Sequence, residues 1–490
     1  MNLLSSSSCI QVAIKTTIIT IMFISTTFTN NINKGPFLVA GFTMPLSKTT
    51  IVNNNNNNIK NNNVDNIFQY TSTAISMSSN NDNSISINPL LSNVKPSATV
   101  QIFSQVKQMQ SEGIDVTSLC VGEPDFPPPQ AVLDAAIQAI QDNDTRYTAV
   151  TGTTSLREAI ANDLKQRKNI IYNPVNEIVV GNGAKQCVYQ GILATVGKGD
   201  AVIVPAPYWP SYPEMVTLTQ AESIILHTKE EEGYLINPTS LRECIENHIT
   251  QNNGVNNIKL LILCNPSNPT GGVHSKKRLE DIAFVLEDYP QIAILADEIY
   301  ERLVYKDSDD DEHVSFASIS PSMYQRTMTI NGFSKAYAMT GMRLGYMAAP
   351  LPLAKAVTTI QGQLTSCAGS ISQAAGVAAL QNVPESEMDD NVRIMREKRD
   401  YVIEQLRSMD GVKLAVPPTG AFYVLPDVSS YYDGDDTQLC LDLLSSKRLA
   451  LVPGSSFGAP GTVRISYATS LEELAVAMDK LREFLEEAKK

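Results

Sequence analysis

The sequence predicts an α/β protein in which a mostly parallel sheet is covered by helices on both faces and is joined to a smaller α/β domain. From Val94 onward, short apolar and β-branched runs alternate with longer helical segments, a pattern typical of parallel strands buried on both faces. The chain has 490 residues, which exceeds the usual size of a single domain. In the last third, a long charged helix and short separate strands replace the regular alternation.

Each strand expected in the large domain stops at residues that break strands, such as Gly181-Asn182-Gly183 and Asn265-Pro266. In sheets of this kind, ligands bind beyond the carboxyl ends of the strands. The expected strands are 177–180, 201–204, 260–264, 291–295 and 327–330, with helices starting at 184 and over 211–218.

The smaller α/β domain is expected to contain the last third of the chain and also the N-terminal segment near 95–126. Its C-terminal part is expected to hold a charged helix over about 392–409, strands at 412–415, 420–425, 449–452 and 463–466, and a final helix. The predicted limits are 1–93 for a leader and an Asn/Ser-rich segment, 94–130 for an N-terminal arm and part of the small domain, 131–372 for the large domain and 373–490 for the small domain.

The first residues have the features of a targeting leader. Residues 1–27 carry one charge, Lys15, and an apolar run over 18–24 that is too short to span a bilayer and suits a signal-peptide core. The following segment LVAGFTMP, with small residues before Phe42, resembles the cleavage motif of bipartite plastid targeting. We therefore expect the plastid stroma, with cytoplasm or mitochondrion as the alternatives, and no membrane in the mature form. A degenerate transmembrane anchor is the alternative interpretation of the apolar run.

Residues 53–58 are six consecutive asparagines within a Ser/Asn-rich tract that reaches about Ser92. Such a composition cannot bury enough apolar surface to offset the chain entropy of folding, so we expect disorder. The predicted fold therefore begins at Val94.

Composition excludes several classes of function. The formal net charge is −13 and no long Lys/Arg run is present, which argues against binding to nucleic acid or an anionic membrane. Seven cysteines form no C-x-x-C pair and four histidines lack ligand spacing. We therefore expect no metal site and no disulfide framework.

The stretch NGFSKAYAMTGMRLGY, 331–346, places Lys335 and Arg343 among small and apolar residues. An unpaired buried charge costs several kcal/mol, so charges in such a setting call for an explanation. Without a function, Lys335 would be a surface lysine whose stem lies along apolar residues, and Arg343 a surface arginine or part of one ion pair.

Other strand ends carry further candidates. The turn Asn182-Gly183-Ala184-Lys185 opens a helix, where free N–H groups and the helix dipole favour a phosphate; an ordinary glycine turn is the alternative. Trp209 is the only tryptophan of the chain. In a loop, its ring could stack on a flat ligand, or it could be a core or interface aromatic residue.

Two more strand ends supply an amide and an acid. Asn268 lies in the proline-rich loop 264–271, which could hold its amide in one orientation or be an ordinary turn. Asp297 ends an apolar strand, with Tyr300 three residues later. A carboxylate in that place needs a cation or several donors, unless it caps a helix.

Together these groups match the needs of pyridoxal 5′-phosphate (PLP). A partly desolvated lysine forms an imine with its aldehyde carbon. An acid keeps the pyridine nitrogen protonated, so that the ring accepts electrons. An arginine binds the phosphate through two parallel hydrogen bonds.

The segment SKAYAMTGMRLGY closely resembles the lysine signature of class I aminotransferases of fold type I. The segments GEPDF, YTAVTGTTSLREAI, SNPTG, ADEIY, GAFY and RISYATS occur in that family's order and spacing, and the resemblance covers 94–490. The chain is most similar to subgroup Iβ, the bacterial-type aspartate aminotransferases, and to the plant plastid form that handles aspartate and prephenate.

The resemblance implies a PLP fold type I domain with a seven-stranded sheet, a homodimer with shared active sites, and transamination between a dicarboxylic amino acid and a 2-oxo acid. Aspartate or glutamate would be the amino donor, and 2-oxoglutarate, oxaloacetate or prephenate the acceptor.

The resemblance also implies roles for individual residues. Lys335 matches the catalytic lysine, Asp297 the partner of the pyridine nitrogen, and Trp209 the stacking ring. Tyr300 and Asn268 match the partners of the ring 3-hydroxyl. The implied phosphate ligands are Gly183, Ala184, Lys185, Ser334, Arg343 and, in the neighbouring subunit's site, Tyr147. The implied substrate residues are Trp209, with the backbone of Gly122, Asn268 and Arg464 for the α-carboxylate, and Thr99 and Lys185 for a distal carboxylate.

One position departs from the family pattern. Met342 stands where the family usually has tryptophan, beside Arg343. Methionine is apolar and adaptable, so we expect repacking with activity retained and an uncertain pocket volume.

Two alternatives remain open in the sequence. One is an aminotransferase of the same fold for alanine, aromatic amino acids or kynurenine, or a lyase; Lys185 with Thr99 favours dicarboxylic substrates. The other is a non-catalytic regulator built on this fold. Such regulators carry a basic helix-turn-helix ahead of the fold, whereas this leader is nearly uncharged.

Overall fold

The computed structural model describes residues 85–96, 98–307 and 312–488. Contacts divide the chain into Met1–Asn61 and Asn62–Lys490, and every described residue belongs to the second unit. The predicted leader and most of the Asn/Ser-rich tract lie outside the described residues. No helix of the described part is long and apolar enough to cross a membrane. The domain limits stated above stay predictions.

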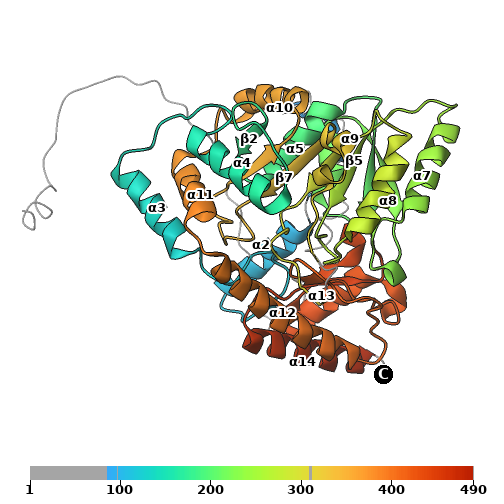
Figure 1. Cartoon of the computed structure of the whole chain (residues 1–490). Helices are drawn as coiled ribbons and strands as arrows, with labels where there is room; N and C mark the ends of the chain where they lie inside the picture. The colour runs from blue at the N-terminus through green and yellow to red at the C-terminus, as the bar shows by residue number, and fades with distance from the viewer. Residues whose placement is uncertain (1–84, 97, 308–311, 489–490) are drawn as a thin grey trace, which may run out of the picture. The chain divides into compact units, whose positions relative to one another are not determined.

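A seven-stranded sheet forms the centre of the described chain, with strand order β2-β8-β7-β6-β5-β3-β4 (Figure 1). The pairs β3–β4, β3–β5, β5–β6 and β6–β7 are parallel, and β8 runs antiparallel to both β2 and β7. The predicted fold class, α/β with a mostly parallel sheet, is confirmed. The strands are β2 (Ile178–Gly181), β3 (Ala201–Ala206), β4 (Glu222–His227), β5 (Ile258–Cys264), β6 (Ala293–Asp297), β7 (Thr327–Gly332) and β8 (Gly345–Ala348).

Alternating residues of each strand face two different layers of helices. On β3, Val202 and Val204 join one apolar cluster, while Ala201 and Ile203 join another. This alternation is the period of two expected for a strand covered on both faces. One layer contains α5 (Ala184–Thr195), α6 (Ser211–Leu218) and α10 (Leu351–Leu364). The other contains α3 (Gln130–Gln141), α4 (Thr154–Lys168), α7 (Pro238–Gln251), α8 (Lys276–Glu287) and α11 (Ser370–Gln381).

Helix ends follow local capping chemistry. Asn237 accepts hydrogen bonds from the first backbone amides of α7, whose first residue is Pro238, the position where a missing N–H costs nothing. The hydroxyl of Ser275 caps α8 in the same way. Helix α4 begins at a Thr153 cap and ends at Asn169 in the left-handed region, as polar residues at these positions predict.

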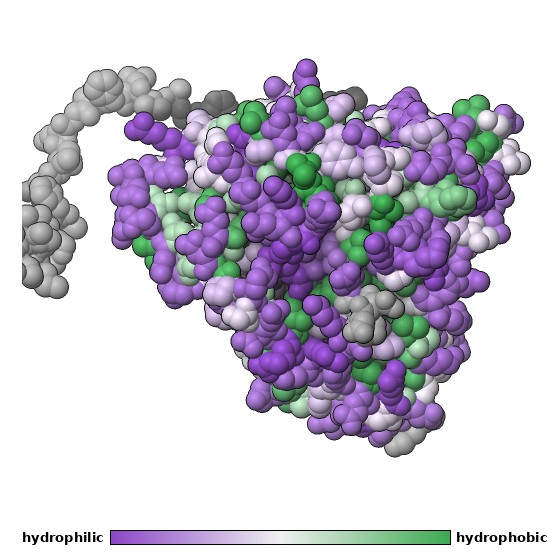
Figure 2. Space-filling view, viewed as in Figure 1, coloured by the Kyte–Doolittle hydropathy of each residue, from purple (hydrophilic) through white to green (hydrophobic). Residues whose placement is uncertain are grey.

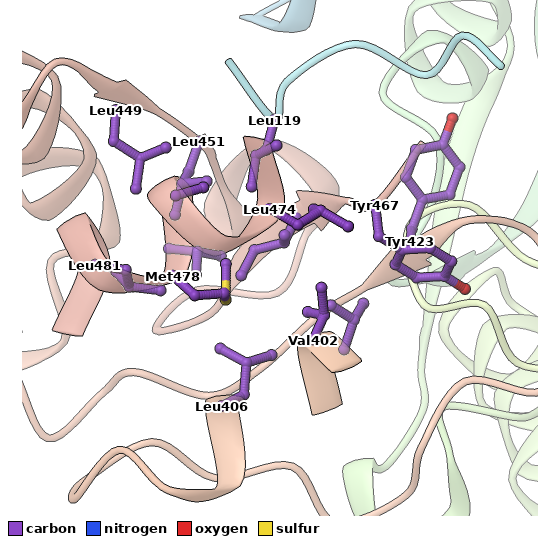
Figure 3. Packing of buried hydrophobic residues seen from close by; sticks show 14 of the residues in the cluster. Leu119, Val402, Leu406, Tyr423, Leu449, Leu451, Tyr467, Leu474, Met478 and Leu481 are labelled. Carbon is purple, nitrogen blue, oxygen red and sulfur yellow. The ribbon is translucent and has the colours of Figure 1, made fainter. Parts of the chain in front are cut away.

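A second α/β region is built from residues at both ends of the described chain. A three-stranded sheet has the order β11-β12-β9, and β1 from the N-terminal segment pairs in parallel with β10. Its apolar core contains Leu119 of the N-terminal segment together with residues of α12 and α14 (Figure 3). The elements are α2 (Ala98–Ser111), β1 (Thr117–Ser118), α12 (Glu385–Arg407), β9 (Tyr423–Val424), α13 (Asp436–Lys447), β10 (Leu449–Ala450), β11 (Val452–Pro453), β12 (Val463–Ser466) and α14 (Leu471–Ala488).

Some element predictions were wrong in detail. Helix α12 begins at Glu385, seven residues before the predicted start at 392, because Pro384 precedes a first turn that carries Glu385 and Glu387, and both features favour a helix start. Residues 412–415 form no strand and make only an isolated bridge between Lys413 and Asp427. The short elements are η2 (Pro89–Asn93), η3 (Glu230–Glu232), η4 (Phe316–Ser318), α9 (Pro321–Tyr324), η5 (Tyr432–Gly434) and η6 (Gly454–Phe457).

Candidate active site

The carboxyl ends of β2, β5, β6 and β7 meet at one edge of the seven-stranded sheet, since these strands run in the same direction. At the end of β2, Gly183 has φ 89° and precedes α5, whose first turn has no side-chain cap. A Cβ atom at Gly183 would collide with the guanidinium of Arg343. That guanidinium is exposed and donates to the carbonyl of Thr340 at 3.0 Å. An uncapped helix start beside an arginine is a suitable place for an anion.

Lys335 follows β7 and the buried Ser334. Its Nζ donates to the carbonyl of Gly122 and lies 6.0 Å from the ring centroid of Tyr300 and 5.9 Å from that of Phe422. Burial lowers the pKa of Lys335 to about 8, against the opposing effect of a nearby Glu123 carboxylate. At neutral pH, a larger fraction of this amine is therefore uncharged and nucleophilic than in an ordinary lysine. The alternative of a surface lysine does not agree with this position.

Asp297 ends β6 and is only 4% exposed. The hydroxyl of Tyr212 donates to its Oδ2 at 2.7 Å, and the amide of Ile299 donates to its Oδ1 at 3.3 Å. Burial raises the pKa of Asp297 to about 6, while the Tyr212 hydrogen bond lowers it. No helix begins at Asp297, because residues 299–302 form a turn, so the helix-cap alternative does not apply. The carboxylate is ionised at neutral pH and able to hold a cationic N–H group.

A third group of residues forms hydrogen bonds between the large-sheet region and the second α/β region. The hydroxyls of Tyr300, after β6, and Tyr423, on β9, are 2.8 Å apart. Arg464, on β12, donates to Oδ1 of Asn268 at 3.1 Å and to the carbonyl of Cys120. All these side chains are buried. The guanidinium Nε of Arg464 is buried without a hydrogen-bond partner in the described part of the chain, which is costly unless an anion binds nearby.

Lys185 and Trp209 lie together beside this edge. Nζ of Lys185 is 5.1 Å from the centroid of the Trp209 ring, and the Trp209 ring contacts the ring of Tyr212 edge-on at 5.3 Å. Burial and the charge of Arg343 lower the pKa of Lys185. A pocket of about 680 Å³ opens here, large enough for a small organic ligand. Its lining includes Lys95, Gln101, Lys185, Tyr189, Glu214 and Arg343.

Two predicted site residues are not gathered with the others. Tyr147 is 89% exposed, and its side chain forms no hydrogen bond or aromatic contact with other described residues. Thr99 is half-buried at the start of α2, close in sequence to Lys95 and Gln101 of the pocket lining, without lining the pocket itself.

Met342, the position that departs from the family pattern, is half-buried and packs against the apolar cluster of α4 and α11. Its side chain contributes to the core at this place and does not line the pocket.

The sequence did not indicate three residues that interact with the candidates. Tyr212 donates to Asp297, the hydroxyls of Tyr423 and Tyr300 form a hydrogen bond, and the Glu123 carboxylate interacts electrostatically with Lys335. A weak signal existed for Tyr212, which is three residues after Trp209 at the start of a helix and therefore lies near it. Tyr423 belongs to the GAFY segment. That motif indicates where Tyr423 lies in the family pattern, but not which residue it contacts.

The donor set fits PLP as a bound group. The ring nitrogen needs an ionised acid, the phosphate needs N–H groups with an arginine, and the aldehyde needs an amine of lowered pKa. Asp297, the start of α5 with Arg343, and Lys335 provide these three at one sheet edge. Among the described residues, no group of His, Cys, Asp or Glu side chains is arranged to hold a metal ion.

Comparison with known proteins agrees with this donor set. Residues 114–481 match the family model for aminotransferase class I and II. A Petunia hybrida protein named bifunctional aspartate aminotransferase and glutamate/aspartate-prephenate aminotransferase is 44% identical over 412 residues, covering 82% of this chain and 83% of its own length. A probable aspartate/prephenate aminotransferase of Rhizobium leguminosarum is 39% identical, covering 80% of this chain and 97% of its own.

Solved structures are similar as well. The aspartate aminotransferase of Rhizobium meliloti superposes with a TM-score of 0.76 at 34% identity, covering 82% of this chain and 99% of that one. The Thermus thermophilus aspartate aminotransferase with maleate gives the same TM-score and identity, covering 82% of this chain and all of that one. These neighbours imply PLP as the cofactor. The chain belongs to the aminotransferase class I and II family.

Proposed function

We propose that this protein is a PLP-dependent aminotransferase that moves the amino group of aspartate or glutamate to a 2-oxo acid, prephenate among them. The observation that carries the proposal is the pairing of Lys335, an amine of lowered pKa, with the buried carboxylate of Asp297 at the same sheet edge. The names of the relatives, aspartate and aspartate/prephenate aminotransferases, support the substrate class.

When bound, PLP supplies an aldehyde carbon and a ring that accepts electrons. The residues of this chain do the remaining work. Lys335 holds the cofactor through its Nζ and moves the proton at the substrate Cα, which needs the uncharged amine. Asp297 keeps the ring nitrogen protonated, and Arg343 with Ser334 and the start of α5 binds the phosphate.

Substrate carboxylates are assigned to two cations. Arg464 is buried with a planar fork of donors and already contacts Asn268, which suits the α-carboxylate present in every substrate. Lys185 lies at the pocket next to Arg343 and suits the distal carboxylate of dicarboxylic substrates, with Thr99 beside the pocket lining.

A spectroscopic and kinetic test separates this proposal from a non-catalytic role. Purified protein loaded with PLP should absorb in the visible region, and aspartate should convert that band. Lys335→Ala should lose the covalent attachment and turnover, while Lys198→Ala, an exposed lysine after α5, should keep both. Multiple turnovers by Lys335→Ala at more than about a hundredth of the wild-type rate would contradict the role of Lys335, since general acid–base catalysis alone contributes at least about a hundredfold.

We also propose a homodimer in which Tyr147 reaches the phosphate of the neighbouring subunit. The exposure of Tyr147 on a single chain supports this, because a conspicuous exposed tyrosine suits an intersubunit contact. Tyr147→Ala should bind PLP more weakly. Mixing Tyr147→Ala with Lys335→Ala subunits should restore one intact site per mixed dimer, so activity should rise well above that of either variant alone. No gain on subunit exchange would contradict shared sites.

The proposed compartment is the plastid stroma. The support is sequence alone: the apolar run over 18–24 and Phe42 within LVAGFTMP. A fluorescent protein fused to residues 1–93 should enter the plastid, and Phe42→Ala should keep the fusion outside. Delivery of the unchanged leader to cytosol or mitochondria would contradict this assignment.

A further inference from the structure

Tyr423 occupies a central position that the proposed roles above do not use. It lies on β9, and its backbone pairs with Ser466 of β12, two residues beyond Arg464. Its side chain is buried at the edge of the apolar core of the second α/β region (Figure 3). The guanidinium of Arg464 lies 4.6 Å from the centroid of the Tyr423 ring and 4.8 Å from that of Phe457. Two aromatic rings therefore fix the position of this cation.

The hydroxyl of Tyr423 points to a different partner. It lies 2.8 Å from the hydroxyl of Tyr300, and the two rings meet edge-on at 5.7 Å. Behind it, a Cβ atom at Gly122 would collide with the phenol oxygen. The backbone of Gly122 thus limits the hydroxyl on one side, while the carbonyl of Gly122 accepts a hydrogen bond from Lys335. The Tyr423 phenol has little room to turn away from Tyr300.

Proton counting sets the direction of this hydrogen bond when a ligand binds. Either phenol can donate in the ligand-free protein. Each hydroxyl has one proton, so if Tyr300 donates to an oxygen of the bound cofactor, Tyr423 must donate to Tyr300. A hydroxyl that accepts a hydrogen bond becomes a stronger donor. Burial, with Tyr423 beside it, raises the pKa of Tyr300, so Tyr300 keeps its proton and remains a donor.

We propose that Tyr423 is a positioning residue that connects the two halves of the site: its ring supports Arg464, and its hydroxyl orients and strengthens Tyr300 as a donor to the cofactor ring oxygen. This inference rests on the proposed function, because it takes Arg464 as the carboxylate site and Tyr300 as a cofactor contact. It assigns the ring and the hydroxyl separate effects, which two substitutions can separate.

Tyr423→Phe removes the hydroxyl and keeps the ring, whereas Tyr423→Leu removes both. The measurements are made on PLP-loaded protein. The first is the pH midpoint at which the visible absorption of the bound cofactor titrates, and the second is the dissociation constant of maleate, a dicarboxylate without an amino group. Tyr172→Phe is the matched control, because Tyr172 is a buried phenol 3.4 Å from the hydroxyl of Thr329 and belongs to a different apolar cluster from Tyr300 and Tyr423.

Tyr423→Phe should raise the pH midpoint by about 0.3 unit or more, because a weaker donor chain stabilises the negatively charged ring oxygen less. Its maleate dissociation constant should stay within about twofold of wild type, since the ring still faces Arg464. Tyr423→Leu should weaken maleate binding by about fivefold or more, the size of a lost contact between a cation and an aromatic ring. Tyr172→Phe should change neither quantity.

A second variant tests the path through Tyr300. In a Tyr300→Phe background, Tyr423→Phe should change the midpoint no further, because the hydroxyl that Tyr423 orients is absent. An unchanged midpoint in Tyr423→Phe, or a midpoint change equal to that of Tyr172→Phe, would overturn the inference. The proposed function fails in a different way: the wild-type protein itself would then show no visible cofactor band.

Discussion

Replacing Asp297 with asparagine should stabilise the cofactor-free protein while removing the activity of the loaded enzyme. The carboxyl is buried, and its pKa is raised from 3.8 to about 6, mainly by burial. A raised pKa in the folded state means that folding favours the protonated acid. The stability contributed by this group is therefore fully present below pH 3.8 and is lost as the pH rises through about 6.

The magnitude follows from the size of the shift. Above pH 7, a pKa shift of about two units lowers the free energy of unfolding by roughly 3 kcal/mol, at about 1.4 kcal/mol per unit. At pH 5 the folded acid is mostly protonated, so the same calculation leaves about half of that, roughly 1.5 kcal/mol. Asparagine is neutral at every pH. Its carbonyl oxygen can accept from Ile299 N–H, and its NH2 group can donate to the Tyr212 oxygen, which reverses the present hydrogen bond and leaves the phenol proton to Sγ of Cys264.

The assay is urea unfolding of the cofactor-free protein at pH 7.5 and pH 5, at one protein concentration. Asp297→Asn should unfold at higher urea than wild type, with the gain at pH 5 about half of that at pH 7.5. Asp134→Asn, on the exposed side of α3, should show no such gain. With PLP bound, Asp297→Asn should lose at least about a hundredfold in kcat, because in the proposed site the ring nitrogen loses its anionic partner. A gain that does not change with pH would refute the burial argument.

Three further predictions concern the cations and the single tryptophan. The rate at which cofactor-free protein captures PLP should rise about tenfold per pH unit and level off near pH 8. The reason is that only the uncharged amine of Lys335 attacks, and its pKa is about 8. A rate that keeps increasing to pH 10 would indicate an ordinary lysine. Arg464→Lys should lower kcat/KM for all amino acids alike, whereas Lys185→Ala should penalise aspartate, glutamate and prephenate about tenfold to a hundredfold more than alanine or phenylalanine. Equal losses for aspartate and phenylalanine in Lys185→Ala would withdraw the distal-carboxylate role. PLP should quench the fluorescence of Trp209, the only tryptophan, and an unchanged emission would contradict its place beside the ring.

The strands β3, β5 and β6 could be predicted because almost all of their residues are buried. Their nearly continuous apolar runs leave few alternatives to a strand covered on both faces. Strand β4 was missed, since it lies at the edge of the sheet and alternates poorly, with only Leu226 buried. Strand β8 was missed because it is only four residues long and its first two, Gly345 and Tyr346, were assigned to the lysine motif. The face seen in Figure 2 is largely hydrophilic, which agrees with a negative chain that buries its apolar runs.

The candidate site could be predicted one strand end at a time, but its cross-connections could not. Parallel strands bring their carboxyl ends to one edge, so polar residues at those ends had to be neighbours. The partner of Asp297 is Tyr212, 85 positions earlier, and the partner of Tyr300 is Tyr423, 123 positions later. Tyr212 sits on a helix and Tyr423 on a strand of another sheet. The hydrophobic periodicity of a segment does not indicate which distant side chain will form a hydrogen bond with it.

The same physical cause acts in opposite directions on the two ionisable groups that matter most. Burial penalises any charge, so it raises the pKa of the Asp297 acid to about 6 and lowers the pKa of the Lys335 amine to about 8. Above pH 6 the acid is still ionised, as a pyridine nitrogen requires, and near pH 8 half of the amine is free to react. In a more exposed site, the pKa of the amine would return towards its ordinary value of 10.5. The amine would then be less reactive at neutral pH. The apolar surroundings of Lys335 therefore account for the lowered pKa of its amine.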